Sequence, residues 1–355
     1  MNEQPGKIRI TTDDLDQVVL ESPAAVPSEK LGSSASDASA RAYGNIRDTA
    51  TESLPESTAK GSVFLKSWFY LGIAGLLGTL IAWGFLEPFF VEGPESSWAD
   101  LLLLPAVVAL LCVGCAIAES VVERSARKAA IRGAIALGIG IPLGFVFNFL
   151  ANIFYNILLS IVAGQGTLTP ESPAWWACRA LAWALFGASA GLVYGVVGLN
   201  GKKLLYGVLG GILGAGIGGA LFDPIALALN SAILSRGLGF ALFGLATGVA
   251  IGLVESALKD RWLYVSAGPL AGKQFILYKP FTTVGRSQGC DIYLFKDLSI
   301  QDLHATFEKR GPRIWLVAHG PVYASGQPVK RKMLENRELL QIGRYNFLYQ
   351  ERHRQ

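Results

Sequence analysis

Long apolar runs, followed by a region of short alternating segments, divide this chain into three parts. The first sixty residues are rich in Ser, Ala, Thr, Glu and Asp and show no sustained apolar periodicity. Such a composition cannot bury enough surface to offset chain entropy, so we expect residues 1–62 to form a disordered tail. Because the first long apolar run begins only near Trp68, we expect no N-terminal signal peptide.

Six apolar runs between residues 63 and 258 are predicted to cross a membrane as helices. A spanning helix needs about 20 mostly apolar residues. The predicted spans are 68–86, 101–118, 133–154, 180–199, 204–222 and 237–254. The stretch from Gly133 to Gly164 has no charge and is too long for one upright span, so we expect a kink at Pro142. The Asp223-Pro224 step is expected to end the fifth span, and residues 224–235 to form a short interfacial or re-entrant helix.

Composition supports a lipid environment for this middle part. Hydrophobic residues make up 51% of the chain and charged residues 16%, against about 25% charged in soluble proteins. The mean hydropathy is +0.39. A CxxC pair, Cys112 and Cys115, lies inside an apolar run without a partnering CxxC or histidine pair. We interpret it as bilayer packing and expect no metal site and no cofactor.

Basic residues predict the orientation of the spans. They cluster before the first span and after the second, fourth and sixth: Lys60, Lys66, Arg124, Arg127, Lys128, Arg132, Lys202, Lys203, Lys259 and Arg261. The other connections are mainly acidic, with Arg179 and Arg236 as exceptions. Positive charge stays on the cytoplasmic side during insertion, so both termini are predicted to be cytoplasmic.

The membrane part has the pattern of three repeated helical hairpins. "ALFGASAGLVYGVVG" from Ala184 resembles "ALFGLATGVAIGLVE" from Ala241, each with glycines at i, i+4 and i+8, and "AESVVER" loosely resembles "VESALKDR". Glycines four apart let helices approach closely in lipid, although glycine-rich apolar helices can also resemble one another by chance. We expect the fifth span to be central. Asparagines at 148, 152 and 156 form a stripe that is predicted to bond between helices or to line a hydrated path. No ionisable residue lies on this stripe, and we expect the bundle to lack buried ionisable groups.

After Arg261 the runs become short, aromatic and β-branched, as in an all-β sandwich, predicted over residues 259–355. Within it lie Gly285-Arg286-Ser287, then Asp291-Ile292, Asp297, His304-Ala305, Trp315, Gly326-Gln327-Pro328-Val329, and Leu334 ahead of Ile342-Gly343. In this order the marks resemble a forkhead-associated (FHA) domain. The fold class expected is therefore an α-helical membrane bundle plus a C-terminal β-sandwich.

The resemblance implies a phosphothreonine-peptide site formed by loops. Its candidate residues here are Arg286, Ser287, Gln301 and Ser325, with Gly285, His304 and Gly326 as structural residues. Gln301 replaces the family's serine, Ser325 its asparagine, and Asp302 a residue that is often basic. Asp302 would repel phosphate, so the alternative is that Arg286 pairs with Asp302 or Asp297. A catalytic role for His304 is the alternative to its structural role.

These features favour a membrane-anchored adaptor that binds a cytoplasmic phosphoprotein, in a bacterial inner membrane. The alternative is a channel or transporter that the FHA-like domain regulates or assembles. We expect no enzyme activity and no nucleic-acid partner. A further candidate ligand is the chain's own tail, where Thr11 is followed at +3 by Asp14, although "TTDDLD" is also compatible with a merely solvated acidic stretch.

Overall fold

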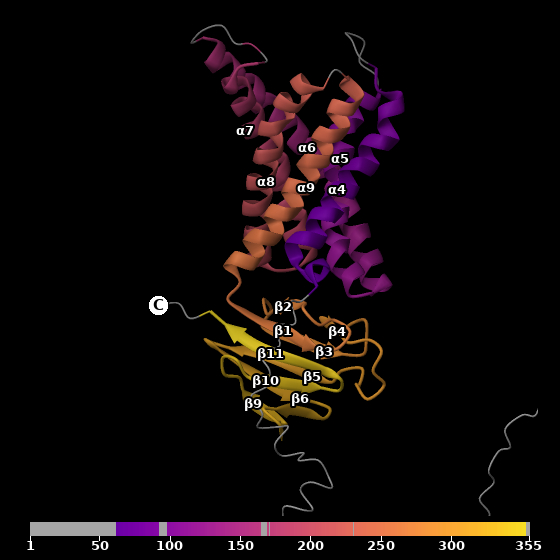
Figure 1. The fold of residues 1–355 in the computed structure, drawn as a ribbon, viewed down its shortest axis with the longest axis vertical. Coiled ribbons are helices and arrows are strands. Elements are labelled where there is room, and N and C mark those ends of the chain that lie inside the picture. The colour runs from indigo at the N-terminus through magenta and orange to yellow at the C-terminus, as the bar shows by residue number, and fades with distance from the viewer. Residues whose placement is uncertain (1–61, 92–97, 165–168, 170, 230, 353–355) are drawn as a thin grey trace, which may run out of the picture. The chain divides into compact units, whose positions relative to one another are not determined.

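Six long helices form the middle part of the chain (Figure 1). The computed structural model describes residues 62–91, 98–164, 169, 171–229 and 231–352, so the predicted disordered tail and Thr11 lie outside the described residues. The helices are α4 (Ser67–Leu86), α5 (Trp98–Val122), α6 (Ala126–Ala163), α7 (Pro173–Val197), α8 (Gly201–Ala228) and α9 (Ala232–Leu258). Two short 3-10 helices, η1 (Val63–Leu65) and η2 (Glu87–Phe89), flank α4. All six long helices are long and apolar enough to cross a membrane, which indicates an integral multi-pass membrane protein.

Polar side chains fix where four of these helices begin. The hydroxyl of Ser125 accepts a hydrogen bond from the Lys128 amide, and those of Ser172 and Ser231 cap α7 and α9 in the same way. The side chain of Asn200 caps α8 by accepting from two amides of its first turn. Each cap satisfies an amide that has no partner within the helix, so the apolar run starts at a defined residue.

Two helices, α6 and α8, run on through prolines at which the sequence predicts a kink or a helix end. Helix α6 has 38 residues and includes Pro142, so it measures about 57 Å at 1.5 Å per residue, well beyond a hydrocarbon core of about 30 Å. Helix α8 continues through Pro224 to Ala228. The separate helix predicted for residues 224–235 is therefore wrong, because its first half completes α8 and its last residues begin α9 at Ala232.

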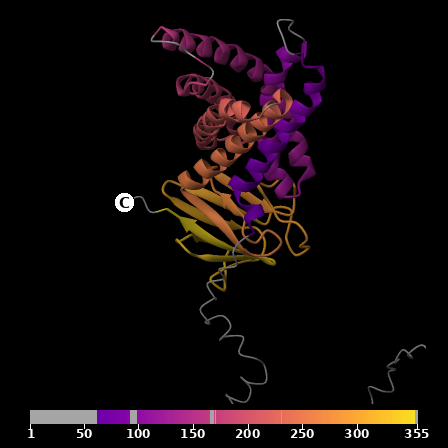
Figure 2. The ribbon, with the colours of Figure 1, turned by 45° about the horizontal axis from the view of Figure 1, so that its top comes forward.

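The helices contact one another in a closed ring. Each packs on the next in chain order from α4 to α9, and α9 packs back on α4 (Figure 2). Helix α5 additionally contacts α7 and α9, whereas α8 packs mainly on α7 and α9. The prediction that the fifth span is central is therefore wrong: α5, with its larger apolar side chains, has the most neighbours. Its Cys112 and Cys115 are buried in the bundle's hydrophobic core.

Matching glycines make matching contacts, as three repeated hairpins would require. A Cβ on Gly187 of α7 would collide with the backbone of Gly211 in α8, the first helix of the next hairpin. A Cβ on Gly244 of α9 would likewise collide with the backbone of Gly75 in α4, the first helix of the first hairpin. The last hairpin thus packs on the first, and this contact closes the ring.

Two ion pairs repeat with the glycines. Arg179 and Arg236 each lie eight residues before the first glycine of the repeated motif, which is Gly187 in α7 and Gly244 in α9. The Nε of Arg179 lies 2.9 Å from Oδ2 of Asp223, and the Nε of Arg236 lies 3.1 Å from Oε1 of Glu87. Asp223 and Glu87 both stand near the end of the neighbouring hairpin's first helix. The two exceptions to the basic-charge pattern are therefore neutralised, which reduces the cost of placing them away from the other cations.

The asparagine stripe on α6 does not join helices. The Nδ2 of Asn152 donates to the carbonyl and side-chain oxygens of Asn148, and that of Asn156 donates to the Asn152 carbonyl at 2.7 Å. All these bonds are exposed and lie within α6, so the prediction of interhelical bonding is wrong. A helix offers a side chain the carbonyl four residues earlier at no cost in tertiary structure, and that local partner is the one used here.

The C-terminal part is the predicted β-sandwich. Its strands are β1 (Arg261–Ala267), β2 (Gln274–Ile276), β3 (Phe281–Gly285), β4 (Ile292–Tyr293), β5 (Ala305–Arg310), β6 (Arg313–Ala318), β7 (Val322–Ala324), β8 (Gln327–Pro328), β9 (Arg331–Met333), β10 (Leu339–Ile342) and β11 (Tyr345–Glu351). One sheet has the order β2-β1-β11-β10-β7-β8 and the other β4-β3-β5-β6-β9. Alternate residues such as Leu263, Phe307 and Phe347 are buried between the sheets. The alternating pattern seen in the sequence thus supplies this core.

Candidate phosphopeptide site and its attachment to the bundle

The loop that follows β3 carries Arg286 and is tied to the loop that precedes β5. The amide of Arg286 donates to the carbonyl of Gln301 at 2.9 Å, and the amide of Ser287 donates to the carbonyl of Asp302 at 3.2 Å. Gly285 makes this approach possible, because a Cβ there would collide with the Asp302 carbonyl. The backbone therefore brings the Gly-Arg-Ser segment beside Gln301, although sixteen residues separate Gly285 from Gln301.

The guanidinium of Arg286 is paired with Asp302. Its Nε and Nη2 lie 3.3 and 3.2 Å from the same carboxylate oxygen, Oδ1. The two side chains are 44% and 76% exposed. An ion pair this exposed contributes only about 0–1 kcal/mol and is screened by salt. Asp302 is thus the carboxylate partner of Arg286 in this structure, and it holds the arginine weakly enough for a dianion to displace it.

The other candidate residues differ in what they offer. Gln301 is exposed, and its side chain is available beside Arg286. The hydroxyl of Ser287 accepts a hydrogen bond from the Gly289 amide at 3.2 Å and so stabilises the loop itself. Ser325 and Gly326, with φ of +48° and +79°, form the two-residue turn between β7 and β8 in the opposite sheet. The structure therefore brings three of the four candidates together, and the described contacts attach Ser325 to Leu339 instead.

His304 is buried with both ring nitrogens engaged. Its Nδ1 accepts from the Gln301 amide at 3.1 Å, which makes Nε2 the protonated nitrogen that donates to the Pro321 carbonyl at 2.9 Å. The ring is 1% exposed and packs against Gly320, where a Cβ would collide with it. This arrangement holds the Gln301 loop in place and leaves no ring nitrogen free for catalysis.

Two aspartates brace the same loops. Asp297 accepts hydrogen bonds from the Ser299 hydroxyl and from the Arg344 amide, and these bonds hold its pKa below the ordinary value. Burial tends to raise the pKa of Asp291, but hydrogen bonds from Lys279 and Thr283 lower it overall. Both carboxylates are therefore ionised and stabilise these loops through hydrogen bonds, and neither lies against Arg286.

The residues that sequence reasoning missed lie where the helices meet the sandwich. Lys273, in the turn between β1 and β2, lies 2.8 Å from Glu123 at the end of α5, and both side chains are almost fully buried. Lys128 of α6 donates to the carbonyl of Asp291 at 3.0 Å. The hydroxyl of Tyr278 donates to Glu255 of α9 at 2.9 Å. The sandwich is thus attached to three helices by buried polar contacts.

Buried ionisable groups are therefore present, contrary to the prediction. Glu119 pairs with Lys203 and Arg132 at 3.0 and 3.1 Å, and Glu255 accepts from two tyrosine hydroxyls. A signal for two of them existed in the sequence, because "AESVV" and "VESAL" place Glu119 and Glu255 at matching points of the repeat. Their partners come from distant segments, and hydropathy does not reveal them. Among the described residues no group of three or more His, Cys, Asp or Glu is arranged to hold a metal ion.

Comparison with known proteins decides what the sandwich is. Residues 282–343 match the family described as the FHA domain. This part of the chain is an FHA domain. The strands β1, β2 and β11 extend the sandwich on both sides of the matched residues. The resemblance seen in the sequence is thereby confirmed.

Curated relatives match about a quarter of the chain. The glycogen accumulation regulator GarA of Mycolicibacterium smegmatis is 33% identical over 90 residues, which cover 24% of this chain and 56% of GarA. The oxoglutarate dehydrogenase inhibitor of Corynebacterium diphtheriae is 32% identical over 92 residues, covering 25% of this chain and 64% of the inhibitor. The chain thus spans little more than half the length of these relatives.

Solved FHA domains are also similar to this one. The FHA domain of CT664 from Chlamydia trachomatis shares 24% identity with a TM-score of 0.25, covering 27% of this chain and all of that domain. The MEK1 FHA domain in complex with a HOP1 phosphothreonine peptide shares 15% identity with a TM-score of 0.24, covering 27% of this chain and all of that one.

Proposed function

We propose that this chain is a membrane-anchored adaptor whose cytoplasmic FHA domain binds a partner protein containing phosphothreonine. The observation that carries the proposal is Arg286, which stands on the FHA loop, is half exposed and, among the described residues, pairs with the exposed carboxylate of Asp302. A phosphate monoester carries about −1.5 to −2 charges at neutral pH, so it competes well with one carboxylate for this guanidinium. Gln301 can add an amide donor beside it. The function is binding and requires no catalytic residue.

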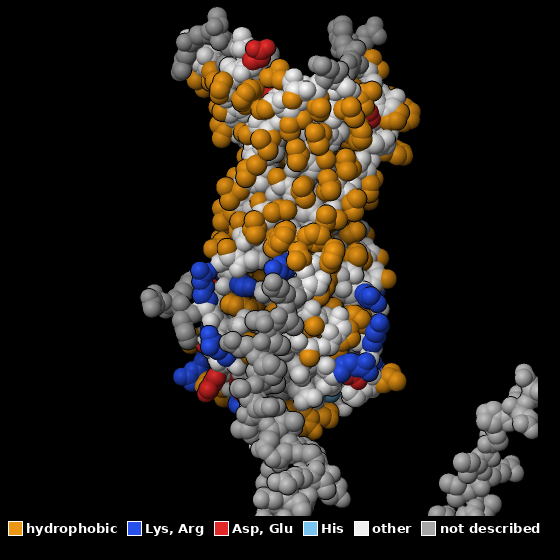
Figure 3. Space-filling model, viewed as in Figure 1, with side chains coloured by type: hydrophobic (Ala, Val, Ile, Leu, Met, Phe, Trp, Pro, Cys, Tyr) orange, Lys and Arg blue, Asp and Glu red, His pale blue; other side chains and the backbone are white. Residues whose placement is uncertain are grey.

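The names of the relatives are in keeping with a regulatory role. GarA is a glycogen accumulation regulator, and the corynebacterial relatives are inhibitors of oxoglutarate dehydrogenase. Here the six helices would confine the proposed binding to a membrane surface. Basic side chains gather at the sandwich end of the bundle (Figure 3), which supports a cytoplasmic location for both termini in a bacterial inner membrane.

The test is a phosphothreonine peptide library presented to the full chain in lipid nanodiscs. Each peptide is offered in phosphorylated and unphosphorylated form, with Arg286→Ala as the site variant and Arg313→Ala, an exposed arginine on β6, as the matched control. We expect retention of a subset of phosphorylated peptides by the natural chain and by Arg313→Ala only. Retention that ignores phosphorylation, or that survives Arg286→Ala, contradicts the proposal.

The chain's own tail is a second proposed ligand of the same site. The tail and the domain belong to one chain, so the effective concentration of the tail would reach about the millimolar range. Phosphorylation of Thr11 would add charge for Arg286 and exclude other partners. A tail peptide phosphorylated at Thr11 should bind the full chain more tightly than the unmodified peptide and more weakly at high salt. If titration calorimetry shows the same binding for the two peptides, phosphorylation of Thr11 does not control access to the site.

A transport function remains the second candidate, and the buried charges of the bundle favour it. Ionisable groups inside membrane helices are commonly functional, and Glu119, Lys203 and Glu255 all lie in candidate spans. The close glycine contacts between helices count against an open pore. Ion or solute flux in liposomes containing the full chain, lost in Glu255→Gln, would favour transport over anchoring.

A further inference from the structure

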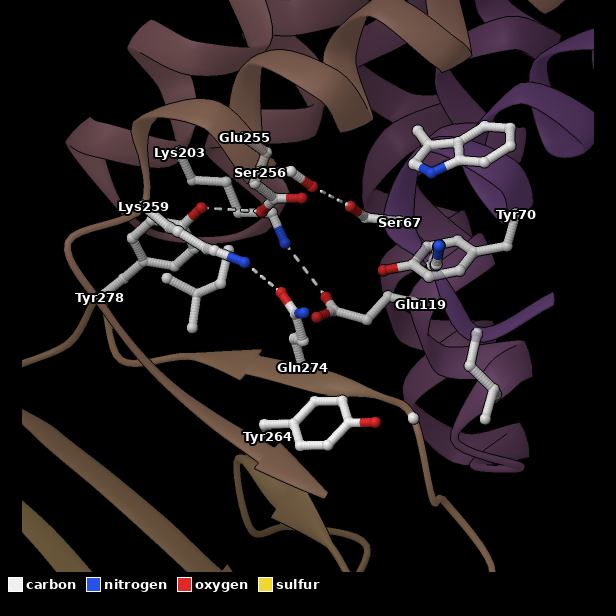
Figure 4. A pocket seen from close by; sticks show the side chains of 15 residues that line it. Ser67, Tyr70, Glu119, Lys203, Glu255, Ser256, Lys259, Tyr264, Gln274 and Tyr278 are labelled. Atoms are coloured by element: carbon white, nitrogen blue, oxygen red, sulfur yellow. Dashed lines mark hydrogen bonds and ion pairs between the residues drawn. The ribbon is translucent and has the colours of Figure 1, made fainter. Parts of the chain in front are cut away.

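A polar cavity of about 340 Å³ lies between the helix ends and the sandwich (Figure 4). Its walls come from both parts of the chain. The bundle contributes side chains of α4, α5, α8 and α9, including Ser67, Tyr70, Glu119, Lys203 and Glu255, and the sandwich contributes Tyr264, Gln274 and Tyr278. The cavity therefore exists only while the sandwich sits on the bundle.

Both carboxylates of the cavity already have their partners. Glu119 is neutralised by Lys203 and Arg132. Glu255 receives the hydroxyl of Tyr194 on Oε2 and that of Tyr278 on Oε1. Neither carboxylate needs a further donor, so the cavity has little remaining capacity for a cationic ligand.

The donors of the cavity are less well satisfied. Lys259 donates to the amide oxygen of Gln274, and its ammonium lies 4.2 Å from the centre of the Trp262 ring. Within the described part of the chain, neither Lys259 nor Lys66 pairs with a carboxylate. Figure 4 shows the hydroxyl of Tyr70 directed into the cavity, and the described contacts give it no acceptor. The same holds for the amide nitrogen of Gln274. Burial lowers the pKa of Lys259 to about 8, although the nearby carboxylate of Glu255 acts in the opposite direction.

We propose that this cavity binds a phosphate group, held by Lys66 and Lys259 with Tyr70 and Gln274 as neutral donors. Lysine ammonium groups and hydroxyls are suitable partners for phosphate oxygens. The cavity is much larger than one phosphate, so it accommodates a substituent as well. Two sources share this chemistry: the headgroup of an anionic phospholipid, and a soluble phosphorylated molecule.

The position favours the lipid source. Four lining residues stand in the terminal turns of α4, α8 and α9: Ser67, Trp68, Lys203 and Glu255. If the apolar parts of these helices fill the hydrocarbon core, their terminal turns meet the headgroup layer of the membrane. Because the cavity is formed by both parts of the chain, its ligand also stabilises the attachment of the FHA domain to the bundle.

The test uses the full chain, delipidated in neutral detergent, with native mass spectrometry as the readout. The probes are dioctanoyl phosphatidylglycerol, inorganic phosphate, and dioctanoylglycerol, which lacks the phosphate. The variants are Lys66→Gln with Lys259→Gln, and Tyr70→Phe, which removes only a hydroxyl. Arg127→Gln is the matched control, an exposed cation at the same end of the bundle that does not line the cavity.

We expect one phosphatidylglycerol per chain, bound at least ten-fold more weakly by the double lysine variant and several-fold more weakly by Tyr70→Phe. Arg127→Gln should bind like the natural chain, and dioctanoylglycerol should not bind. Binding of inorganic phosphate without the lipid, with the same loss in the variants, assigns the site to a soluble ligand. Absence of both, or binding that the lysine and tyrosine variants leave unchanged, overturns the proposal.

Discussion

At the scale of single residues, the balance between Arg286 and its neighbours decides how well phosphate binds. Asp302→Asn removes the carboxylate that now occupies the guanidinium, and an exposed pair contributes about 0–1 kcal/mol. We therefore expect Asp302→Asn to tighten phosphopeptide binding about two- to five-fold, measured by titration calorimetry on the full chain in nanodiscs. Weaker binding in this variant would mean that Asp302 supports the site instead of competing with the ligand.

Gln301→Ser is a second residue-scale prediction. It places a hydroxyl where the FHA family has one, next to the Arg286 amide that already bonds to the Gln301 carbonyl. A hydrogen bond to a charged group contributes about 1.5–3 kcal/mol, so affinity for the same peptide should rise about ten-fold. An unchanged or lower affinity would show that the Gln301 side chain does not face the phosphate.

The pKa of Asp297 gives a prediction for acid stability. Hydrogen bonds from Ser299 and from the Arg344 amide lower this pKa in the folded chain, so the ionised carboxylate stabilises the fold above the unfolded value of about 4. This contribution is lost as the pH falls through the lower folded pKa. Asp297→Asn should therefore lower the urea midpoint of the sandwich at pH 7 and have little effect near pH 3. Hydrogen-exchange mass spectrometry of β5 and β6 in the full chain would measure the urea midpoint at pH 7 and near pH 3. A midpoint that Asp297→Asn lowers equally at both pH values would contradict a stabilising role for the ionised carboxylate.

At this scale the sequence is a partial guide. The order of Gly285, Arg286 and His304 is enough to predict an FHA domain, because a collision-free turn and a buried ring demand those residue types locally. The pairing of Arg286 with Asp302 was foreseen only as an alternative, since a charge pattern shows which partners exist and not which one is reached. The buried Lys273–Glu123 pair could not be foreseen, because 150 residues separate its members.

At the scale of helices and strands, the glycine contacts predict which substitutions the bundle tolerates. Gly187→Val puts side-chain atoms into the backbone of Gly211 and should destabilise the α7–α8 contact by about 1–3 kcal/mol. Gly84→Ala and Gly138→Ala are matched controls, because a Cβ at either helical position meets nothing within 4 Å. They should be neutral or slightly stabilising. Thermal unfolding in detergent measures the stability of all three variants. An equal loss of stability in all three would contradict the close α7–α8 contact at Gly187.

The link between α5 and the sandwich should depend on one buried pair. Lys273→Met leaves Glu123 buried with only Lys128 nearby at 3.6 Å, and an uncompensated buried charge costs about 3–5 kcal/mol. Hydrogen exchange in residues 262–278 should therefore quicken. Combining Lys273→Met with Glu123→Leu should restore most of the protection, whereas Lys309→Met, an exposed control on β5, should have no effect. Failure of the double variant to recover would show that the pair is not the main contact.

The number of helices and the presence of a β-sandwich follow from the apolar pattern, whereas helix ends and helix neighbours do not. Apolar runs predict α4 to α9 because lipid requires about 20 such residues. Continuation of α8 through Pro224 escaped prediction, since a proline inside a membrane helix is tolerated where the surroundings satisfy the backbone carbonyl that loses its amide partner. The central place of α5 depends on which side chains interlock, and periodicity within one helix carries no information on that.

At the scale of the whole molecule, the charge pattern predicts that both termini are cytoplasmic. Glu171, in the connection between α6 and α7, is an exposed reporter position. Glu171→Cys should react with an impermeant thiol reagent added to intact cells, whereas Leu199→Cys, 80% exposed, should react only after permeabilisation. The four native cysteines are buried and provide a low background. The reverse labelling pattern would place the FHA domain outside the cytoplasm.

The central claim is that Arg286 recognises phosphate on a threonine. Its most direct measurement is the affinity of the full chain in nanodiscs for the best library peptide, with and without the phosphate, before and after Arg286→Ala. We predict at least ten-fold tighter binding of the phosphorylated form by the natural chain, and no preference in Arg286→Ala, because the charge-assisted hydrogen bonds to Arg286 are lost. Equal affinity of the natural chain for both forms of every peptide, or a preference that persists in Arg286→Ala, would contradict this account.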